Sequence, residues 1–321
     1  MSRKFEVETM EKMESKVSVG IYAVSGAGKT TAALKLAKGI QEQLYPKEKL
    51  IDIGGYIDTE KKSATKSIGR TVAGEKLEPM KYINFEPPYS LYDLMEAIDA
   101  LKNQGCKILV IDSYSHFWSG KSGVLDKASE IEKILSERGK LKQYGAWSEK
   151  EIIDLKHILK DIITSSDMHI IFCMRAKTEY EIEPSKSGKT TIRAIGVKPD
   201  MQGDVEYEPD LVINIDRQKH TIYPMKDRLG FTEYRLVTPN PDSPITIEDG
   251  KELAKLATAG IPLEELNKKK KETLIQFILK EKSVKSSKVK AVEASTKKEF
   301  TKESLSKLSL PQLTKIVNYI K

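Results

Sequence analysis

The chain has 321 residues, of which 39% are hydrophobic and 31% charged. This length suffices for one large domain with its own core and a smaller appendage. No apolar run is long enough for a membrane-spanning helix, and residues 1–16 are charged throughout, which argues against a signal peptide. We therefore expect a cytoplasmic protein that makes no contact with a membrane.

The net charge of +7 is distributed unevenly along the chain. Residues 265–321 contain 15 lysines and 6 glutamates, a net charge of +9, whereas the remainder has 39 basic and 41 acidic residues, a net charge of −2. Such a tail can bind a polyanion through counterion release, but lysine runs are also ordinary solvated helix surface. The sequence leaves both interpretations open.

The stretch from Ala23 to Thr31, AVSGAGKTT, has the pattern of a phosphate-binding loop. An apolar strand-like run at 17–22 precedes it, and a helical pattern follows to Ile40. Alanine replaces the usual first glycine, a mild change at a strand end. Lys29 is predicted to reach the β- and γ-phosphates and Thr30 to contact Mg²⁺. The predicted ATP-binding residues are Ser25, Gly26, Ala27, Gly28, Lys29, Thr30 and Thr31.

Apolar periodicity predicts the elements that follow. We expect strands at 50–57, 81–85, 107–111, 169–174, 211–215, 221–224 and 234–236. We expect helices between Ser90 and Gly105, at 124–138, and after a capping box of Ser148 and Glu151. Strands that alternate with helices and are then followed by further strands predict an α/β fold. Its central sheet is mostly parallel, flanked by helices, with antiparallel strands at an edge.

A second Gly-Lys-Thr, at 188–190, has the wrong context for a phosphate-binding loop. Alternating strand-like residues lie on both sides of it and no helix follows, which predicts a β-hairpin. The two cysteines, Cys106 and Cys173, lie in or beside apolar runs without metal-ligand spacing, so we interpret them as reduced core residues.

The C-terminal part predicts a small helical appendage. Residues 261–282 form a lysine-rich amphipathic pattern, 283–298 are typical of a linker, and 302–321 fit one or two short helices that dock on a partner or on the main domain. The expected organisation is an N-terminal segment at 1–15, an ATPase core at 16–258, the lysine-rich helix and linker at 259–298, and a helical element at 299–321.

An acidic residue at the end of a buried strand is the second requirement of a phosphate-loop ATPase. The run Ile108-Leu-Val-Ile-Asp112 provides it. We therefore predict that Asp112 and Thr30 together hold Mg²⁺, and that ATP and Mg²⁺ are the cofactors.

Three further sites depend on resemblance. Asp58-Thr59-Glu60, after the predicted second strand, resembles the acidic pair of RecA-like recombinases, which implies that Glu60 activates water. Arg175 follows the predicted strand that ends at Met174, where RecA-like proteins have an Asn or Gln that senses the γ-phosphate. That position is Met or Arg here, so either Arg175 senses as a cation or the coupling between ATP and DNA is altered. The Lys226-Asp-Arg228-Leu-Gly motif is similar to the trans-acting cations of DnaB-type helicases, which implies action across a subunit interface.

Several motifs occur along the chain in the same order as in a more specific family, the bacteriophage and prophage RecA-core ATPases, which the chain therefore resembles. This is an AAA-type nucleotide-binding family associated with recombination and single-strand annealing. The motifs are DSYSHFW at 112–118, Trp147, RAKTEY at 175–180, GVKP at 196–199 and EYEPD at 206–210. The resemblance covers 16–236 and implies a homo-oligomer, ring or filament, that acts on single-stranded DNA in the bacterial host cytosol. We interpret residues 116–118 as core or interface packing rather than a base-stacking platform.

DNA contacts in RecA-like proteins come from mobile loops after later strands, and the predicted hairpin is the counterpart here. Its candidate DNA-binding residues are Lys186, Lys189, Arg193 and Lys198. Two alternatives remain open: a hexameric helicase or helicase-loading motor, and a nucleotide-gated interaction protein with slow turnover. The tail could bind a phage replication protein or a single-strand-binding protein.

Overall fold

The computed structural model describes residues 12–139, 145–184, 190–260, 263–283, 287–296 and 299–320. The chain divides into two compact units. The larger comprises Lys16–Ala257, and the smaller comprises Met1–Ser15 with Thr258–Lys321. None of the described helices is long and apolar enough to cross a membrane.

The larger unit contains an eight-stranded sheet in the order β10-β9-β1-β7-β6-β2-β5, with β8 paired to β7. Neighbours from β9 to β5 are parallel, whereas β10 and β8 pair antiparallel. The strands are β1 Ser18–Ala23, β2 Gly54–Asp58, β5 Lys81–Asn84, β6 Ile108–Asp112, β7 His169–Pro184, β8 Thr190–Pro199, β9 Leu211–Ile215 and β10 Ile222–Asp227. A separate ribbon pairs β3 Thr71–Val72 with β4 Glu75–Lys76. The predicted α/β architecture, a mostly parallel central sheet with antiparallel additions, is thus confirmed.

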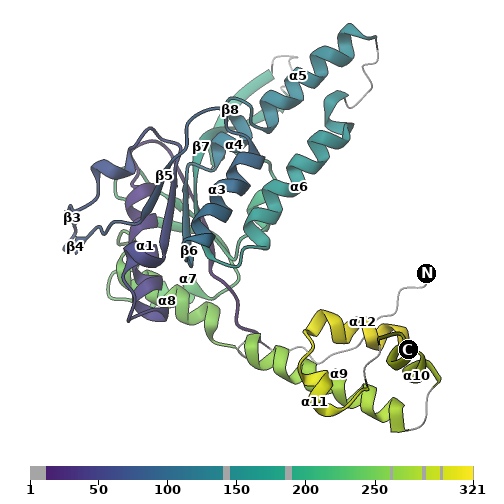
Figure 1. The fold of residues 1–321 in the computed structure, drawn as a ribbon. Helices are drawn as coiled ribbons and strands as arrows, with labels where there is room; N and C mark the ends of the chain where they lie inside the picture. The colour runs from purple at the N-terminus through teal and green to yellow at the C-terminus, as the bar shows by residue number, and fades with distance from the viewer. Residues whose placement is uncertain are drawn as a thin grey trace. The chain divides into compact units, whose positions relative to one another are not determined.

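Helices cover both faces of this sheet (Figure 1). The helices are α1 Lys29–Leu44, α2 Leu50–Ile53, α3 Leu91–Asn103, α4 Ser115–Ser119, α5 Val124–Glu137, α6 Lys150–Thr164, α7 Phe231–Leu236 and α8 Ile247–Thr258, with short 3₁₀ turns at Ala64–Lys66, Gly145–Ser148 and Val205–Tyr207. Alternate residues of each strand enter different apolar clusters: Ile171 and Cys173 pack with α1 and α8, whereas Ile170 and Phe172 pack with α3 and α6. This period-two alternation places one hydrophobic core on each face of the sheet.

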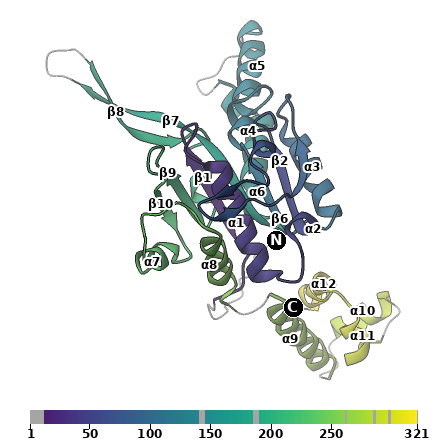
Figure 2. The same cartoon turned by 90° about the vertical axis from the view of Figure 1, so that its left-hand side faces the viewer.

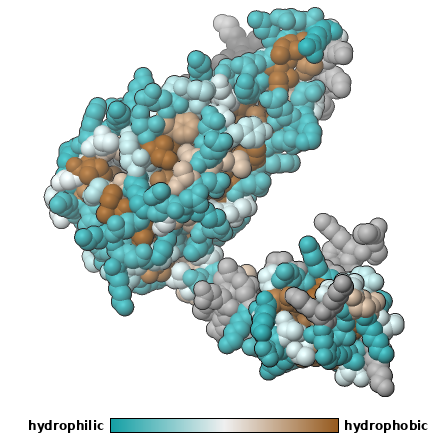
Figure 3. All heavy atoms as spheres, in the orientation of Figure 1, coloured by the Kyte–Doolittle hydropathy of each residue, from teal (hydrophilic) through white to brown (hydrophobic). Residues whose placement is uncertain are grey.

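Both cysteines are buried and free, as expected, with Cys106 in one cluster and Cys173 in the other. The face of the larger unit shown in Figure 3 is mostly hydrophilic, and one of its apolar patches lies toward the outer part of α5 and α6. Large apolar residues with exposed side chains in that region include Ile134, Trp147 and Ile153.

Two helix starts test the capping predictions. The Ser90 hydroxyl accepts a hydrogen bond from the Asp93 backbone N–H at 3.4 Å, so the predicted cap of α3 is confirmed. The predicted capping box at Ser148 is wrong, because α6 begins at Lys150 with Glu149 as its N-cap residue. The Ser148 hydroxyl instead donates to the Gly145 carbonyl within the preceding 3₁₀ turn.

Two predicted strands are also wrong. The first half of 50–57 is the short helix α2, and the strand begins only at Gly54. Residues 234–236 belong to α7, because Gly230 adopts a left-handed φ of 85° and Asp227 caps the turn. The Asp227 carboxylate accepts hydrogen bonds from the backbone N–H groups of Leu229 and Thr232, satisfying donors at the start of the helix.

The smaller unit contains α9 Leu263–Ser283, α10 Ser287–Thr296, α11 Lys302–Ser306 and α12 Leu310–Ile320. The expectation of a linker over 283–298 is wrong, since Val289 and Val292 of α10 are buried in an apolar cluster. Leu305 and Leu313 enter the same cluster together with Ile278 of α9. The helices at 302–320 therefore pack on α9 and α10 within the smaller unit, and their docking on a partner stays a prediction.

Candidate functional site

The loop between β1 and α1 has the geometry that a phosphate-binding loop requires. Gly26 and Gly28 have φ values of 81° and 95°, the left-handed region that glycine adopts without strain. Gly28 is the N-cap residue of α1 and Lys29 is its first residue. The loop N–H groups and the helix N-terminus thus lie together at the carboxyl edge of the sheet, where phosphates bind in such folds.

A cleft of about 760 Å³ opens over this loop. It is lined by Ala23, Ser25, Gly26, Gly28, Lys29, Thr30, Glu60, Ser63, Ser67, Arg70, Asp112, Arg175 and Ala176. Most of the predicted ATP-binding residues therefore meet Glu60, Asp112 and Arg175 in one place. Of the other two, Ala27 is buried and Thr31 lines a neighbouring cavity.

Asp112 and Thr30 form the candidate magnesium position. The Thr30 hydroxyl donates to Asp112 Oδ2 at 2.6 Å, and the Tyr56 hydroxyl donates to the same oxygen at 2.8 Å. Burial raises the pKa of Asp112, whereas these two hydrogen bonds act to lower it. A hydroxyl and a carboxylate at a phosphate site are ligands that Mg²⁺ prefers, so the residues present fit the ion.

Lys29 lies across the loop. Its ammonium donates to the carbonyl oxygens of Ala23 and Val24 at 3.0 and 3.3 Å. This arrangement keeps the charged group in the cleft and beside Gly26 and Gly28, where it can meet a β- or γ-phosphate.

Glu60 is held by a bidentate ion pair with Arg175. Arg175 Nε and Nη2 donate to Glu60 Oε1 and Oε2 at 3.0 and 3.1 Å. Burial acts to raise the pKa of Glu60, but the hydrogen bonds and charge of Arg175 outweigh it and lower that pKa. Glu60 is therefore an ionised carboxylate at neutral pH, as a general base must be.

Hydrogen bonds from neighbouring residues also hold the turn that carries Glu60. Asp58 Oδ1 accepts a hydrogen bond from the Glu60 backbone N–H at 2.7 Å. The Thr59 hydroxyl lies 2.6 Å from His116 Nδ1, and the His116 ring stacks on Tyr89 with centroids 4.6 Å apart. His116, Phe117 and Trp118 are all buried, in agreement with the packing role predicted for them.

Lys226 and Arg228 lie outside this cleft in the described structure. Both side chains donate to the carbonyl oxygen of Tyr207, Arg228 at 3.0 Å. Burial lowers the pKa of Lys226, and the nearby Arg228 lowers it further. Their action on a neighbouring subunit stays a prediction.

The predicted hairpin is present as β7 and β8, which pair antiparallel from Ala176–Pro199 to Pro184–Thr190. Lys186 and Lys189 lie outside the described residues. The backbone of Arg193 belongs to β8, and the Lys198 ammonium pairs with Glu179 at 3.3 Å. The DNA-binding role of these residues stays a prediction.

Sequence reasoning missed several residues near the cleft, including Tyr56, Tyr82 and His220.

His220 belongs to a second, apolar cavity of about 290 Å³ on the other side of the loop. Other residues that line this cavity include Val72, Ile215 and Ile245. His220 Nδ1 lies 2.9 Å from the Ala27 carbonyl oxygen and lines the same cavity. Contacts between segments far apart in the sequence bring these residues to the loop, so local patterns could not reveal them.

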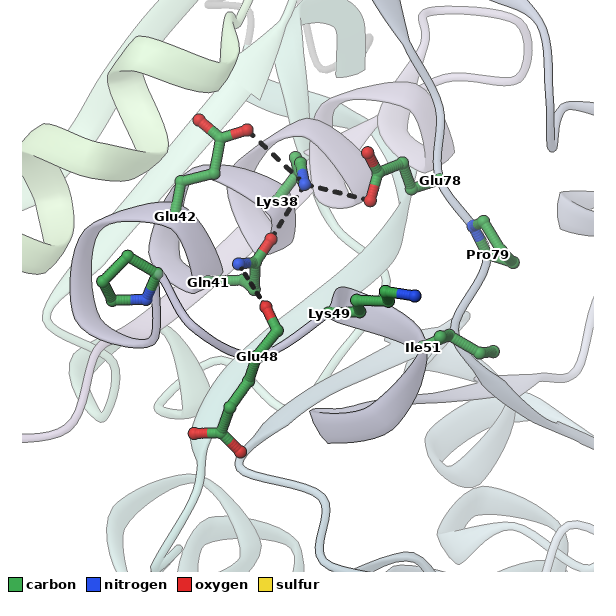
Figure 4. Close-up of a pocket in the computed structure, with 9 residues that line it drawn as sticks. Lys38, Gln41, Glu42, Glu48, Lys49, Ile51, Glu78 and Pro79 are labelled. Atoms are coloured by element: carbon green, nitrogen blue, oxygen red, sulfur yellow. Dashed lines mark hydrogen bonds and ion pairs between the residues drawn. The ribbon is translucent and has the colours of Figure 1, made fainter.

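Another cavity, of about 560 Å³, lies beside the C-terminal half of α1 (Figure 4). Its polar groups largely satisfy one another: Lys38 Nζ donates to Gln41 Oε1 and Glu78 Oε2, both at 2.9 Å. Gln41 Nε2 donates to the Glu48 carbonyl at 2.8 Å. We assign no binding role to this cavity.

The sheet order, the glycine-rich loop and the Asp112 strand end together define a P-loop ATPase. Comparison with protein families agrees: a family model described as "AAA domain" matches residues 15–245. The chain therefore belongs to this AAA domain family.

Among solved structures, the chain is similar to a KaiC-like protein from the hyperthermophilic archaeon Pyrococcus horikoshii OT3. The identity is 16%, the match covers 67% of this chain and 80% of that one, and the TM-score is 0.34. A search of curated proteins gives no match.

Proposed function

We propose that this protein binds ATP with Mg²⁺ in the cleft over the phosphate-binding loop, hydrolyses it, and uses the cycle to act on single-stranded DNA. Recombination or annealing of the bacteriophage type is the proposed setting, with a homo-oligomer as the working form. The observation that carries the ATPase part is the convergence of Lys29, Thr30, Asp112 and Glu60 on one cleft.

Each residue has a distinct task in this proposal. The loop N–H groups and Lys29 bind the phosphate oxygens and offset their charge. Thr30 and Asp112 would hold Mg²⁺, which supplies charge neutralisation at the phosphates when bound. Glu60 accepts a proton from the attacking water, and the apolar cavity beside Ala27 suits a planar nucleobase.

The DNA part rests on the continuity of β7. This strand carries Arg175 in the cleft and runs on to Pro184 in the hairpin, which stands out beyond the rest of the sheet (Figure 2). Arg175 can bind either Glu60 or a γ-phosphate, so a change in its partner would act directly on the base of the hairpin. Two exposed lysines lie at that base, Lys177 paired with Asp200 and Lys198 paired with Glu179, and in this proposal they exchange these carboxylates for backbone phosphates.

DNA binding by the full chain tests this part. A fluorescent single-stranded oligonucleotide is titrated with protein in the presence of ATP, ADP or no nucleotide. Lys198→Glu should weaken binding roughly tenfold, because the reversal removes a phosphate contact and adds repulsion. The matched control is Lys255→Glu on α8, which likewise breaks one exposed lysine–glutamate pair and should bind as the wild type does. Absence of binding in every nucleotide state would contradict the DNA role, and equal affinity of both variants would contradict the hairpin site.

The neighbouring cations Lys226 and Arg228 favour a motor that completes its site across a subunit interface, as in a hexameric helicase. Arg228→Ala should abolish turnover while leaving ATP binding intact, since the residue lies outside its own cleft. Mixed with Lys29→Ala protein, it should regain activity, because each variant supplies what the other lacks. The control is a mixture of Arg228→Ala protein with protein that carries both Lys29→Ala and Arg228→Ala. No recovery of hydrolysis above that control would rule out action in trans, and unwinding of a forked duplex would favour the helicase.

A further inference from the structure

We propose that two stacked tyrosines, Tyr56 and Tyr82, are positioning residues that set the two acidic groups of the cleft independently. Tyr56 orients Asp112 for the metal, and Tyr82 orients the turn that presents Glu60 to water. This inference rests on the proposed ATPase function and adds to it two residues that no motif of the P-loop includes.

The two rings face each other across neighbouring strands. β2 and β5 are parallel, with Tyr56 opposite Tyr82 and Asp58 opposite Asn84. The ring centroids are 6.4 Å apart and the planes differ by 21°, a stacked arrangement. Tyr56 is 2% exposed and Tyr82 is 37% exposed. Stacking restricts each ring, so each hydroxyl has a defined direction.

Tyr56 acts on the metal side of the cleft. Its hydroxyl donates to Asp112 Oδ2 at 2.8 Å, the oxygen that also accepts from Thr30 at 2.6 Å. The two donors come from different elements, one from α1 behind the loop and one from the neighbouring strand β2. The phenol therefore fixes the rotation of a buried carboxylate without depending on the loop, and Thr30 can turn toward an ion while Asp112 keeps its orientation.

Tyr82 acts on the water side. Its hydroxyl donates to Asp58 Oδ2 at 3.1 Å, while Asp58 Oδ1 accepts the backbone N–H of Glu60 at 2.7 Å. Burial and the charge of Asp58 raise the pKa of Tyr82 to about 12, so the phenol remains a donor at neutral pH. The chain of contacts runs from β5 through Asp58 to the backbone of Glu60, and it does not include Asp112.

Because the Tyr56–Asp112 and Tyr82–Asp58 contacts are separate, variants of the full chain that each lack one tyrosine hydroxyl can test them individually. Tyr56→Phe and Tyr82→Phe are compared with Tyr92→Phe, which removes a hydroxyl from an exposed ring on α3. The first readout needs no turnover: the thermal midpoint of each protein is measured in ADP while Mg²⁺ is titrated. The second is the steady-state kcat for ATP at saturating Mg²⁺. The midpoint without nucleotide checks that each variant folds.

Tyr56→Phe should require about tenfold more Mg²⁺ for half of the nucleotide-induced stabilisation, the size of effect typical of residues that orient metal ligands. Tyr82→Phe should titrate like the wild type but show a kcat lowered by about tenfold, since a misplaced base slows the reaction. A Mg²⁺ titration of Tyr56→Phe that matches Tyr92→Phe, or an unchanged kcat for Tyr82→Phe, overturns the inference. If the wild type itself gains no stability from Mg²⁺ and ADP, the proposed function fails instead.

Discussion

Replacement of Lys29 by alanine should reduce ATP hydrolysis to background. The ammonium lies in the cleft, against the carbonyl oxygens of Ala23 and Val24, with no other lysine among the cleft residues that the structure describes. Its loss removes the positive charge that would meet the β- and γ-phosphates, where charge develops as the bond to the leaving group breaks. We expect turnover to fall by about 10³-fold or more, given what fixed cations contribute to phosphoryl transfer.

The measurement is phosphate release at saturating Mg²⁺ and ATP, with Lys66→Ala as the matched control. Lys66 is exposed in the 3₁₀ turn beside Ser67, which lines the cleft, but is not itself a lining residue. It should hydrolyse ATP as the wild type does. Retention of most of the activity by Lys29→Ala would mean that the phosphates do not bind at this loop.

The second large effect is expected for Glu60→Gln, which should bind ATP normally but turn it over about 10²- to 10⁴-fold more slowly, the range that a general base contributes. The amide has the shape of the carboxylate and keeps an oxygen for Arg175, so the cleft should be preserved. It cannot accept a proton from water. Binding and turnover therefore separate in this variant, whereas Lys29→Ala should impair the phosphate contacts themselves.

Affinity for a fluorescent ATP analogue and kcat are measured on the same preparation. Glu86→Gln is the control: Glu86 is exposed and accepts a hydrogen bond from Asn84, beyond the cleft. If Glu60→Gln hydrolyses ATP within a few-fold of the wild type, the proton acceptor is another group or a water chain. The role of Glu60 would then be limited to holding Arg175.

The parts of the molecule that follow local rules could be predicted from the sequence. The phosphate-binding loop depends on two glycines and a following helix, and the strand that ends at Asp112 is a short apolar run. The hairpin of β7 and β8 follows from alternation around Gly188. In each case the signal lies within a few consecutive residues, which is why it survives without tertiary information.

The errors and omissions concern features that a local apolar pattern does not show. The helix α7 depends on Asp227, four residues before its start, which caps the preceding turn. The residues at 287–296 are helical because Val289 and Val292 pack with α9. The pairing of Tyr56 with Tyr82 requires the register of β2 against β5. The cap of α7 is local but lies outside the apolar pattern, which favoured a strand. Packing between separate elements determines α10 and the tyrosine pair, and composition alone does not reveal it.

The most direct test of the account is steady-state ATP hydrolysis by the full chain, measured with and without single-stranded DNA and in parallel with Lys29→Ala. The account predicts Mg²⁺-dependent hydrolysis that DNA accelerates severalfold and that is lost in the variant. Hydrolysis that is abolished in the variant but indifferent to DNA would contradict the DNA-handling function and favour a nucleotide-gated interaction protein. Hydrolysis that survives in Lys29→Ala would contradict the assignment of the cleft itself.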